Sequence, residues 1–73
     1  MAEQTILIAE DDPDIRDGVR ILLSGEGYHI IEAENGTRAL EVFRPEVDLV
    51  ILDIMMPGMS GLRVCEELRK LLS

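Results

Sequence analysis

Three acidic residues stand at two places where the chain leaves a run of apolar residues. Glu10 and Asp11 follow the apolar run 5–9. Asp53 follows a second apolar run, 49–52. Each run has the length and the β-branched content of a buried strand. If the two strands lie parallel and adjacent, all three carboxylates emerge at the carboxyl edge of one sheet, where open α/β sheets bind their ligands.

The chemistry expected of this cluster is the binding of a divalent metal ion. Three crowded carboxylates repel one another, so without a cation at least one of them should have a raised pKa. A hard divalent cation relieves the repulsion, and carboxylate oxygens are ligands that suit Mg²⁺. The alternative interpretation is that the three residues are ordinary solvated carboxylates at the ends of strands.

Two segments of the sequence resemble those of a known family. Residues 6–16, with the order Ile-Leu-Ile-Ala-Glu-Asp-Asp-Pro-Asp-Ile-Arg, are similar to the opening of a two-component response regulator receiver domain. Residues 48–61 are similar to the phosphoacceptor segment of the same family. The Glu-Asp-Asp form of the first cluster looks most like the transcription-factor branch. Both motifs occur in the family's order, and the resemblance runs nearly from end to end.

The resemblance implies a role for each acidic residue. Asp53 matches the phosphoacceptor, which takes a phosphoryl group from a histidine kinase or phosphotransfer protein. Asp11 and Asp53, with the backbone carbonyl of Met55, match the direct ligands of Mg²⁺, and Glu10 would act on the ion through water. The expected function is therefore that of a phosphoacceptor in a phosphorelay signalling system, which is not an enzyme in its own right.

The order of elements expected from the sequence is strand, helix, strand, helix, strand, helix. Asp12 as N-cap and Pro13 at the first helical position mark the start of the first helix, and glycines end it. The continuous apolar run of the third strand suits a strand covered on both faces. The expected strands are 5–9, 28–32 and 48–52, and the expected helices begin near residues 13, 35 and 61. Their expected apolar faces include Ile15, Gly18, Val19 and Leu22 in the first helix, and Cys65, Leu68 and Leu72 in the third.

This alternation favours an α/β fold with parallel strands joined by right-handed crossovers. The resemblance supplies the strand order, two-one-three, and the fold class: a flavodoxin-like three-layer sandwich of the receiver type, truncated to βαβαβα. The order places strand 5–9 in the centre, beside strand 48–52. His29 would then lie exposed in an edge strand, and Cys65 is interpreted as a small core residue rather than a reactive thiol.

Composition excludes several classes of function. The formal net charge of −8 argues against direct contact with nucleic acid, which needs clustered basic residues. A single cysteine forbids an internal disulfide and suits a reducing cytosol, so a cytoplasmic location is expected. No apolar stretch approaches the length of a membrane span.

Residues 1–73 are interpreted as one partial receiver domain, made of the first three strand–helix units. By resemblance, the fourth and fifth units, with a hydroxyl residue, a lysine and an aromatic position, have no counterpart here. The strand 48–52 would then have a bare, apolar edge, and Ile21 could be left exposed on the first helix. We therefore expect a homodimer through that edge. The alternative function is a truncated or engineered half-receiver that associates with itself and lacks competent phosphotransfer.

Overall fold

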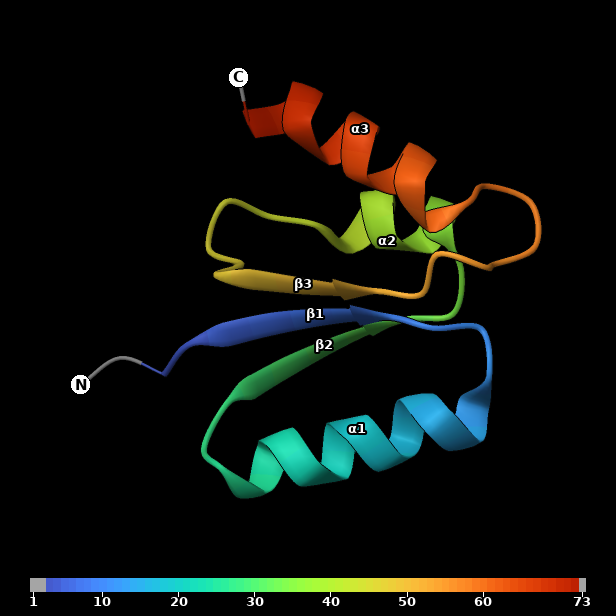
Figure 1. Cartoon of the computed structure of the whole chain (residues 1–73). Helices are drawn as coiled ribbons and strands as arrows, with labels where there is room; N and C mark the ends of the chain where they lie inside the picture. The colour runs from blue at the N-terminus through green and yellow to red at the C-terminus, as the bar shows by residue number, and fades with distance from the viewer. Residues whose placement is uncertain (1–2, 73) are drawn as a thin grey trace.

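The computed structural model describes residues 3–72, which form a three-layer α/β unit (Figure 1). The three strands make one parallel sheet in the order β2-β1-β3, with α1 on one face and α2 and α3 on the other. The predicted element order, strand order and fold class are confirmed. The elements are β1 (Thr5–Ala9), α1 (Pro13–Gly25), β2 (His29–Ala33), α2 (Gly36–Val42), β3 (Leu49–Leu52) and α3 (Gly61–Leu72).

The second strand lies one residue further along the chain than the predicted range 28–32. Tyr28 remains part of the turn that ends α1, because its N–H donates to the Leu23 carbonyl at 3.3 Å. At the other end, the Ala33 carbonyl accepts a hydrogen bond from the Glu10 N–H at 3.1 Å. This bond extends the pairing of β2 with the central strand, so Ala33 belongs to β2.

The third strand begins at Leu49 and is one residue shorter than the predicted range 48–52. Asp48 meets β1 in a different way: its N–H donates to the Thr5 carbonyl at 2.8 Å, and its carboxylate accepts from the Thr5 N–H at 2.8 Å. A side chain thus replaces one backbone partner at the start of the pairing.

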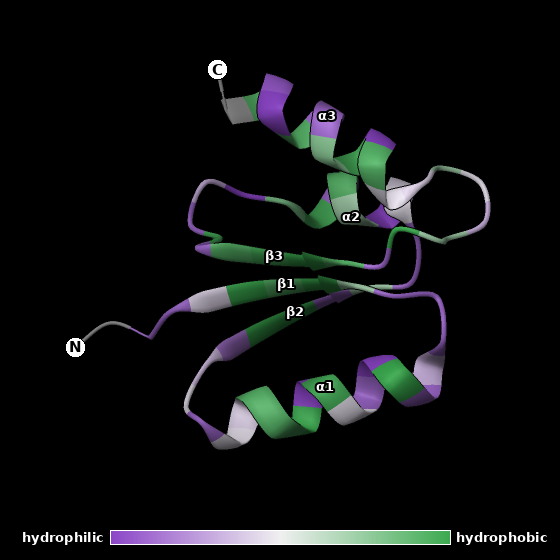
Figure 2. Cartoon of the chain, in the orientation of Figure 1, coloured by the Kyte–Doolittle hydropathy of each residue, from purple (hydrophilic) through white to green (hydrophobic). Residues whose placement is uncertain are grey.

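The principal core lies between the sheet and the pair α2 and α3. In Figure 2, β1 and β3 are hydrophobic over nearly their whole length. Alternate residues of a strand point to opposite faces, so β1 sends Leu7 and Ala9 into this core and Ile6 and Ile8 to the α1 side. The buried core residues are Leu7, Ala9, Ala33, Ala39, Met56, Val64 and Leu68.

The apolar stripe of α3 differs from the predicted one. Val64 is fully buried, whereas Cys65 is only half-buried. Leu68 is buried as predicted, and the side chain of Leu72 lies outside the described part of the chain. The stripe therefore runs through Gly61, Val64 and Leu68, a spacing of three and four residues that follows the helical repeat.

The face of the sheet under α1 is only partly covered, which corrects two further predictions. The predicted apolar face of α1 is exposed at Ile15 (55%) and Leu22 (70%), and only Val19 on it is half-buried. Likewise β3 is covered on one face: Leu49 (54%) and Ile51 (37%) are exposed. The helix α1 packs on β2 and β1, which leaves the β3 side of this face open.

One expectation about the surface of α1 is confirmed. Ile21 is exposed, at 57%. Among residues 3–72 the structure has no helix that is both long and apolar enough to cross a membrane.

Gly61 allows the start of α3 to lie against the end of β3. Its N–H donates to the Ile54 carbonyl at 3.2 Å. A Cβ atom at this position would lie 2.8 Å from the Ile54 Cα and closer still to the Asp53 carbonyl oxygen. Both obstacles are backbone atoms, which cannot rotate away, so only glycine fits here without a shift of the chain that carries Asp53.

We therefore expect Gly61→Ala to destabilise the fold by about 1–3 kcal/mol, the usual cost of overpacking. Gly18→Ala is the matched control, because Gly18 is exposed within α1 and a Cβ there meets nothing within 4 Å. That change should stabilise the fold by about 0.5–1 kcal/mol through helix propensity. Urea unfolding followed by circular dichroism measures both. Equal stabilities for Gly61→Ala and the wild type would contradict the steric argument.

Candidate functional site

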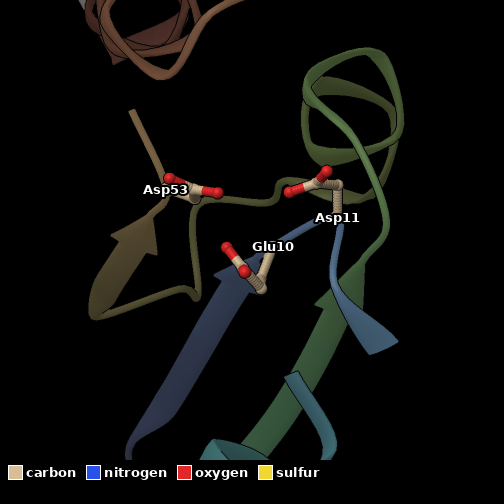
Figure 3. A group of neighbouring side chains, drawn as sticks. All are labelled: Glu10, Asp11 and Asp53. Atoms are coloured by element: carbon tan, nitrogen blue, oxygen red, sulfur yellow. The ribbon is translucent and has the colours of Figure 1, made fainter. Parts of the chain in front are cut away.

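The pairing of β1 with β3 brings the three predicted acidic residues together. Ala9 pairs with Leu52, and the Asp53 N–H donates to the Ala9 carbonyl at 3.0 Å. The next residues of both strands therefore leave the sheet at the same edge. Glu10, Asp11 and Asp53 each offer one carboxylate oxygen, and these oxygens all lie within 4.8 Å of one another. Figure 3 shows the three side chains converging from the two strand ends.

The fourth acidic residue of the segment, Asp12, has a different task. Its carboxylate accepts hydrogen bonds from the Asp14 N–H at 2.9 Å and the Ile15 N–H at 3.3 Å. It therefore caps the first turn of α1, as predicted, and satisfies amides that have no partner within the helix.

The carboxylate of Asp53 is held in its ionised form. Its Oδ1 accepts a hydrogen bond from the Met55 N–H at 3.0 Å. This bond, and secondarily a hydrogen bond with Glu10, lowers the pKa of Asp53 below its usual value. Met55 contacts the cluster through this N–H, and its side chain is exposed. The part assigned by resemblance to the Met55 carbonyl stays a prediction.

Glu10 carries the electrostatic cost of the cluster. Its partial burial raises its pKa, and the neighbouring carboxylates of Asp53 and Asp11 raise the pKa further. The raised pKa expected from the crowding is thus found at Glu10. Since the pKa of Asp53 moves the other way, a proton taken up by this pair goes to Glu10 first and leaves Asp53 charged.

The donor set fits a hard divalent cation. All three side chains offer oxygen, the ligand that Mg²⁺ prefers. Two oxygens on one Mg²⁺ at about 2.1 Å can be at most about 4.2 Å apart. The three carboxylate oxygens lie within 4.8 Å of one another, which is close to this range.

The loop after Asp53 is anchored at both ends. Met56 is buried in the core, and Gly58 adopts a positive φ of 77°, which favours glycine. Gly61 then admits the start of α3 beside the Asp53 carbonyl. Ordinary turn chemistry and a role in shaping the site are both compatible with this arrangement, as expected for the Pro57–Gly61 segment.

One residue that the sequence analysis did not single out also contacts the site. The Arg16 Nη1 donates to the Glu10 carbonyl at 2.7 Å. A usable signal was present in the sequence: once Asp12 is accepted as the N-cap, Arg16 lies in the first turns of α1. Long helical side chains point back toward the N-terminus of their helix, and so toward Glu10.

Two other candidates lie away from the cluster. His29 is exposed and pairs with Thr5, at the opposite end of β1 from Glu10. Cys65 is half-buried in α3. Neither belongs to the acidic group, which agrees with the interpretation of His29 as an exposed edge residue.

Comparisons with known proteins agree on one family. The response regulator receiver domain family matches residues 6–72. The chain is 49% identical over 65 residues to the uncharacterized transcriptional regulatory protein YrkP of Bacillus subtilis. The aligned region covers 89% of this chain and 28% of YrkP. The chain therefore spans under a third of the length of that relative.

Solved structures show the same likeness. The response regulator TrrA of Thermotoga maritima, in complex with Mg²⁺-BeF, has a TM-score of 0.86 and 51% identity over 93% of this chain and 60% of TrrA. A second structure shows TrrA in complex with the histidine kinase ThkA, and matches with a TM-score of 0.82 and 51% identity over 92% of this chain and 59% of that one.

The raised pKa of Glu10 predicts that Glu10→Gln stabilises the fold when divalent cations are chelated. Because the pKa of Glu10 is higher in the folded chain, the wild type loses stability as the pH rises through that pKa. The variant should thus melt about 2 °C higher at pH 7, a small effect because the groups are near the surface. Below the ordinary pKa of glutamate the difference should vanish.

Thermal melts between pH 3 and pH 8 measure this difference. Glu66→Gln, at an exposed position of α3, is the control and should show no comparable pH dependence. A stability difference for Glu10→Gln that stays constant with pH would contradict the assignment of the repulsion to Glu10.

Proposed function

The chain belongs to the response regulator receiver domains of two-component systems, and we propose that it acts as the phosphoacceptor of such a system. In this proposal Asp53 accepts the phosphoryl group, while Glu10, Asp11, Asp53 and the Met55 carbonyl hold Mg²⁺. One observation carries the proposal: the ionised Asp53 faces two further carboxylates across the ends of β1 and β3. One oxygen from each of the three carboxylates lies within 4.8 Å of the other two.

The solved relatives support the choice of ion and partner. TrrA is 51% identical to this chain and has been crystallised with Mg²⁺-BeF and, separately, with the histidine kinase ThkA. We infer by analogy that this chain takes its phosphoryl group from a histidine kinase or phosphotransfer protein. The single cysteine suits a cytoplasmic location, and the net charge of −8 suits a protein surface rather than nucleic acid as partner.

The reaction begins with an Asp53 carboxylate oxygen that attacks the phosphorus of a phosphohistidine. An O–P bond forms and the P–N bond breaks, and the imidazole nitrogen keeps the electron pair and takes up a proton. The Met55 N–H prepares this step, because it keeps the Asp53 carboxylate ionised and fixes its orientation. Mg²⁺, when bound, would neutralise charge on the carboxylates and on the phosphoryl oxygens.

Residues 1–73 are proposed as the first three strand–helix units of a receiver. The family's lysine and hydroxyl residue at the phosphoryl site have no counterpart among them by resemblance. We therefore propose that residues 1–73, taken alone, bind Mg²⁺ but gain a phosphoryl group slowly or not at all.

Asp53→Asn should weaken Mg²⁺ binding by at least about tenfold, since a neutral amide loses the charge that attracts the ion. Asp17→Asn is the matched control: it also removes one charge, from an exposed side chain of α1 outside the cluster. Titration calorimetry measures both affinities. Identical Mg²⁺ binding by the wild type and Asp53→Asn would remove Asp53 from the metal site.

The same proteins test phosphotransfer. Incubation with Mg²⁺ and phosphoramidate, a donor with a P–N bond, followed by intact mass, should show at most a slow gain of about 80 Da per chain. The gain should be absent from Asp53→Asn. A gain retained by that variant would overturn the acceptor assignment, and a rapid, complete gain by the wild type would overturn the proposed impairment.

A second candidate function is self-association as a structural unit, and β3 favours it. Both β2 and β3 are edge strands in the described sheet. Exposed Glu32 lies within β2, whereas β3 has the sequence Leu-Val-Ile-Leu, without a charge. Leu49 and Ile51 of β3 are exposed. An uncharged, apolar edge invites pairing with another chain, so we propose a two-fold dimer in which the two β3 strands pair antiparallel.

For this dimer, size-exclusion chromatography with light scattering should give twice the chain mass at micromolar concentration. Leu49→Lys should give a monomer, because the axis brings two like charges together. Leu49 is a better probe than Leu52, which packs against the core. Ile21→Lys, on α1 and similarly exposed, is the control and should stay dimeric. A folded wild-type monomer would refute the dimer, and a dimeric Leu49→Lys would move the interface away from β3.

A further inference from the structure

We propose that Arg16 is a positioning residue for the acidic site, which fixes the peptide between Glu10 and Asp11 and thereby the two carboxylates on either side of it. The inference rests on the proposed Mg²⁺ site and adds a residue of α1 to it. Arg16 would act through the backbone of Glu10 and would not bind the ion.

The contacts of Arg16 join three parts of the fold. Its Nη1 donates to the Glu10 carbonyl at 2.7 Å, and its Nε lies 3.5 Å from a carboxylate oxygen of Glu32 in β2. The side chain is only 19% exposed. A guanidinium can make both contacts at once because its donors are arranged in a rigid fork. The single ammonium of a lysine cannot span the two partners.

The backbone of Glu10 is consequently held from two sides. Its N–H donates to the Ala33 carbonyl of β2 at 3.1 Å, while its carbonyl accepts from Arg16 of α1 at 2.7 Å. A peptide unit is planar, so fixing the Glu10 carbonyl also fixes the Asp11 N–H and the direction in which the chain enters Asp11. The positions of both carboxylates follow from this one peptide.

The charge of Arg16 has a smaller part in the site than its geometry. The ion pair with Glu32 balances that charge on the β2 side. The pKa shifts of Glu10 and Asp53 arise from burial, from backbone amides and from the carboxylates themselves. Removing Arg16 should therefore disturb where the ligands lie more than how strongly they are charged.

Arg20 provides a matched comparison on the same helix. Its Nε lies 3.7 Å from the other carboxylate oxygen of Glu32, and it also pairs with Asp17. Arg16 is the one of the two that reaches the Glu10 carbonyl. Substitutions at the two arginines thus remove the same charge and a contact to the same glutamate. They differ in the Glu10 contact, which Arg16 makes, and in the Asp17 contact, which Arg20 makes on its own helix.

The test compares Arg16→Gln, Arg16→Lys and Arg20→Gln in the full 73-residue chain. With circular dichroism confirming that each variant is folded, Mg²⁺ affinity is measured by calorimetry at low and at high salt. Arg16→Gln should weaken Mg²⁺ binding by about tenfold, at the low end of what loss of a residue that orients ligands does. Arg20→Gln should change it less than about twofold, and the gap should persist at high salt, where charge effects are screened.

A second readout needs no metal. In the chelated protein, the amide resonance of Asp11 should shift in Arg16→Gln and stay close to its wild-type position in Arg20→Gln. Arg16→Lys, which keeps the charge and serves if Arg16→Gln does not fold, should also lose Mg²⁺ affinity. Wild-type affinity in Arg16→Lys, or equal effects at the two arginines, would overturn the positioning role.

The two proposals fail in distinguishable ways. If the wild type does not bind Mg²⁺ but the Asp11 amide responds to Arg16→Gln alone, the metal site is wrong and the anchoring of the Glu10–Asp11 peptide stands. If the wild type binds Mg²⁺ and Arg16→Gln binds equally well, the metal site stands and the role of Arg16 is wrong.

Discussion

The hydrogen bond from the Asp53 N–H to the Ala9 carbonyl closes the parallel pairing of β1 with β3 at the edge where both acidic segments leave the sheet. A slip of this pairing by one residue would turn every side chain of β3 to the opposite face. Asp48 and Thr5 oppose such a slip at the far end of the pair through two further hydrogen bonds. The register of β1 and β3 thus sets the geometry of the site. Arg16 of α1 and Gly61 of α3 add further contacts to the backbone of Glu10 and Asp53.

The carboxylates of the two acidic segments are held in different ways. Asp12 turns to cap α1, and Asp53 is satisfied by the Met55 amide. Partial burial and the neighbouring carboxylates together raise the pKa of Glu10. Glu10 therefore carries a cost of the crowding, while the carboxylate proposed as the nucleophile stays ionised at a lower pH than an ordinary aspartate.

Much of this could be predicted from the sequence because the signals are local. Apolar runs identify the strands, Asp12 and Pro13 identify the start of α1, and acidic residues at two strand ends identify the cluster. Three features were not predicted from the sequence because they depend on tertiary contacts. The burial of Val64 follows from the approach of α3 to Gly36, where a Cβ would meet the Val64 side chain. The open β3 side of the sheet face under α1 depends on how α1 lies across the sheet. So does the contact of Arg16 with Glu10, although the position of Arg16 after the N-cap gave a usable signal.

The central position of β1 divides the acidic site between two strands of different robustness. Ile6, Leu7, Ile8 and Ala9 are buried, and β1 is paired along both sides, so its amides should exchange with solvent deuterium only when the whole fold opens. The strand β3 is paired along one side and half covered, and can detach by itself at lower free energy. Glu10 and Asp11 thus follow the strand whose amides should exchange most slowly, whereas Asp53 follows a strand whose amides should exchange faster. A cation that bridges the ends of β1 and β3 would oppose the local opening of β3. Its binding would therefore slow deuterium uptake along β3.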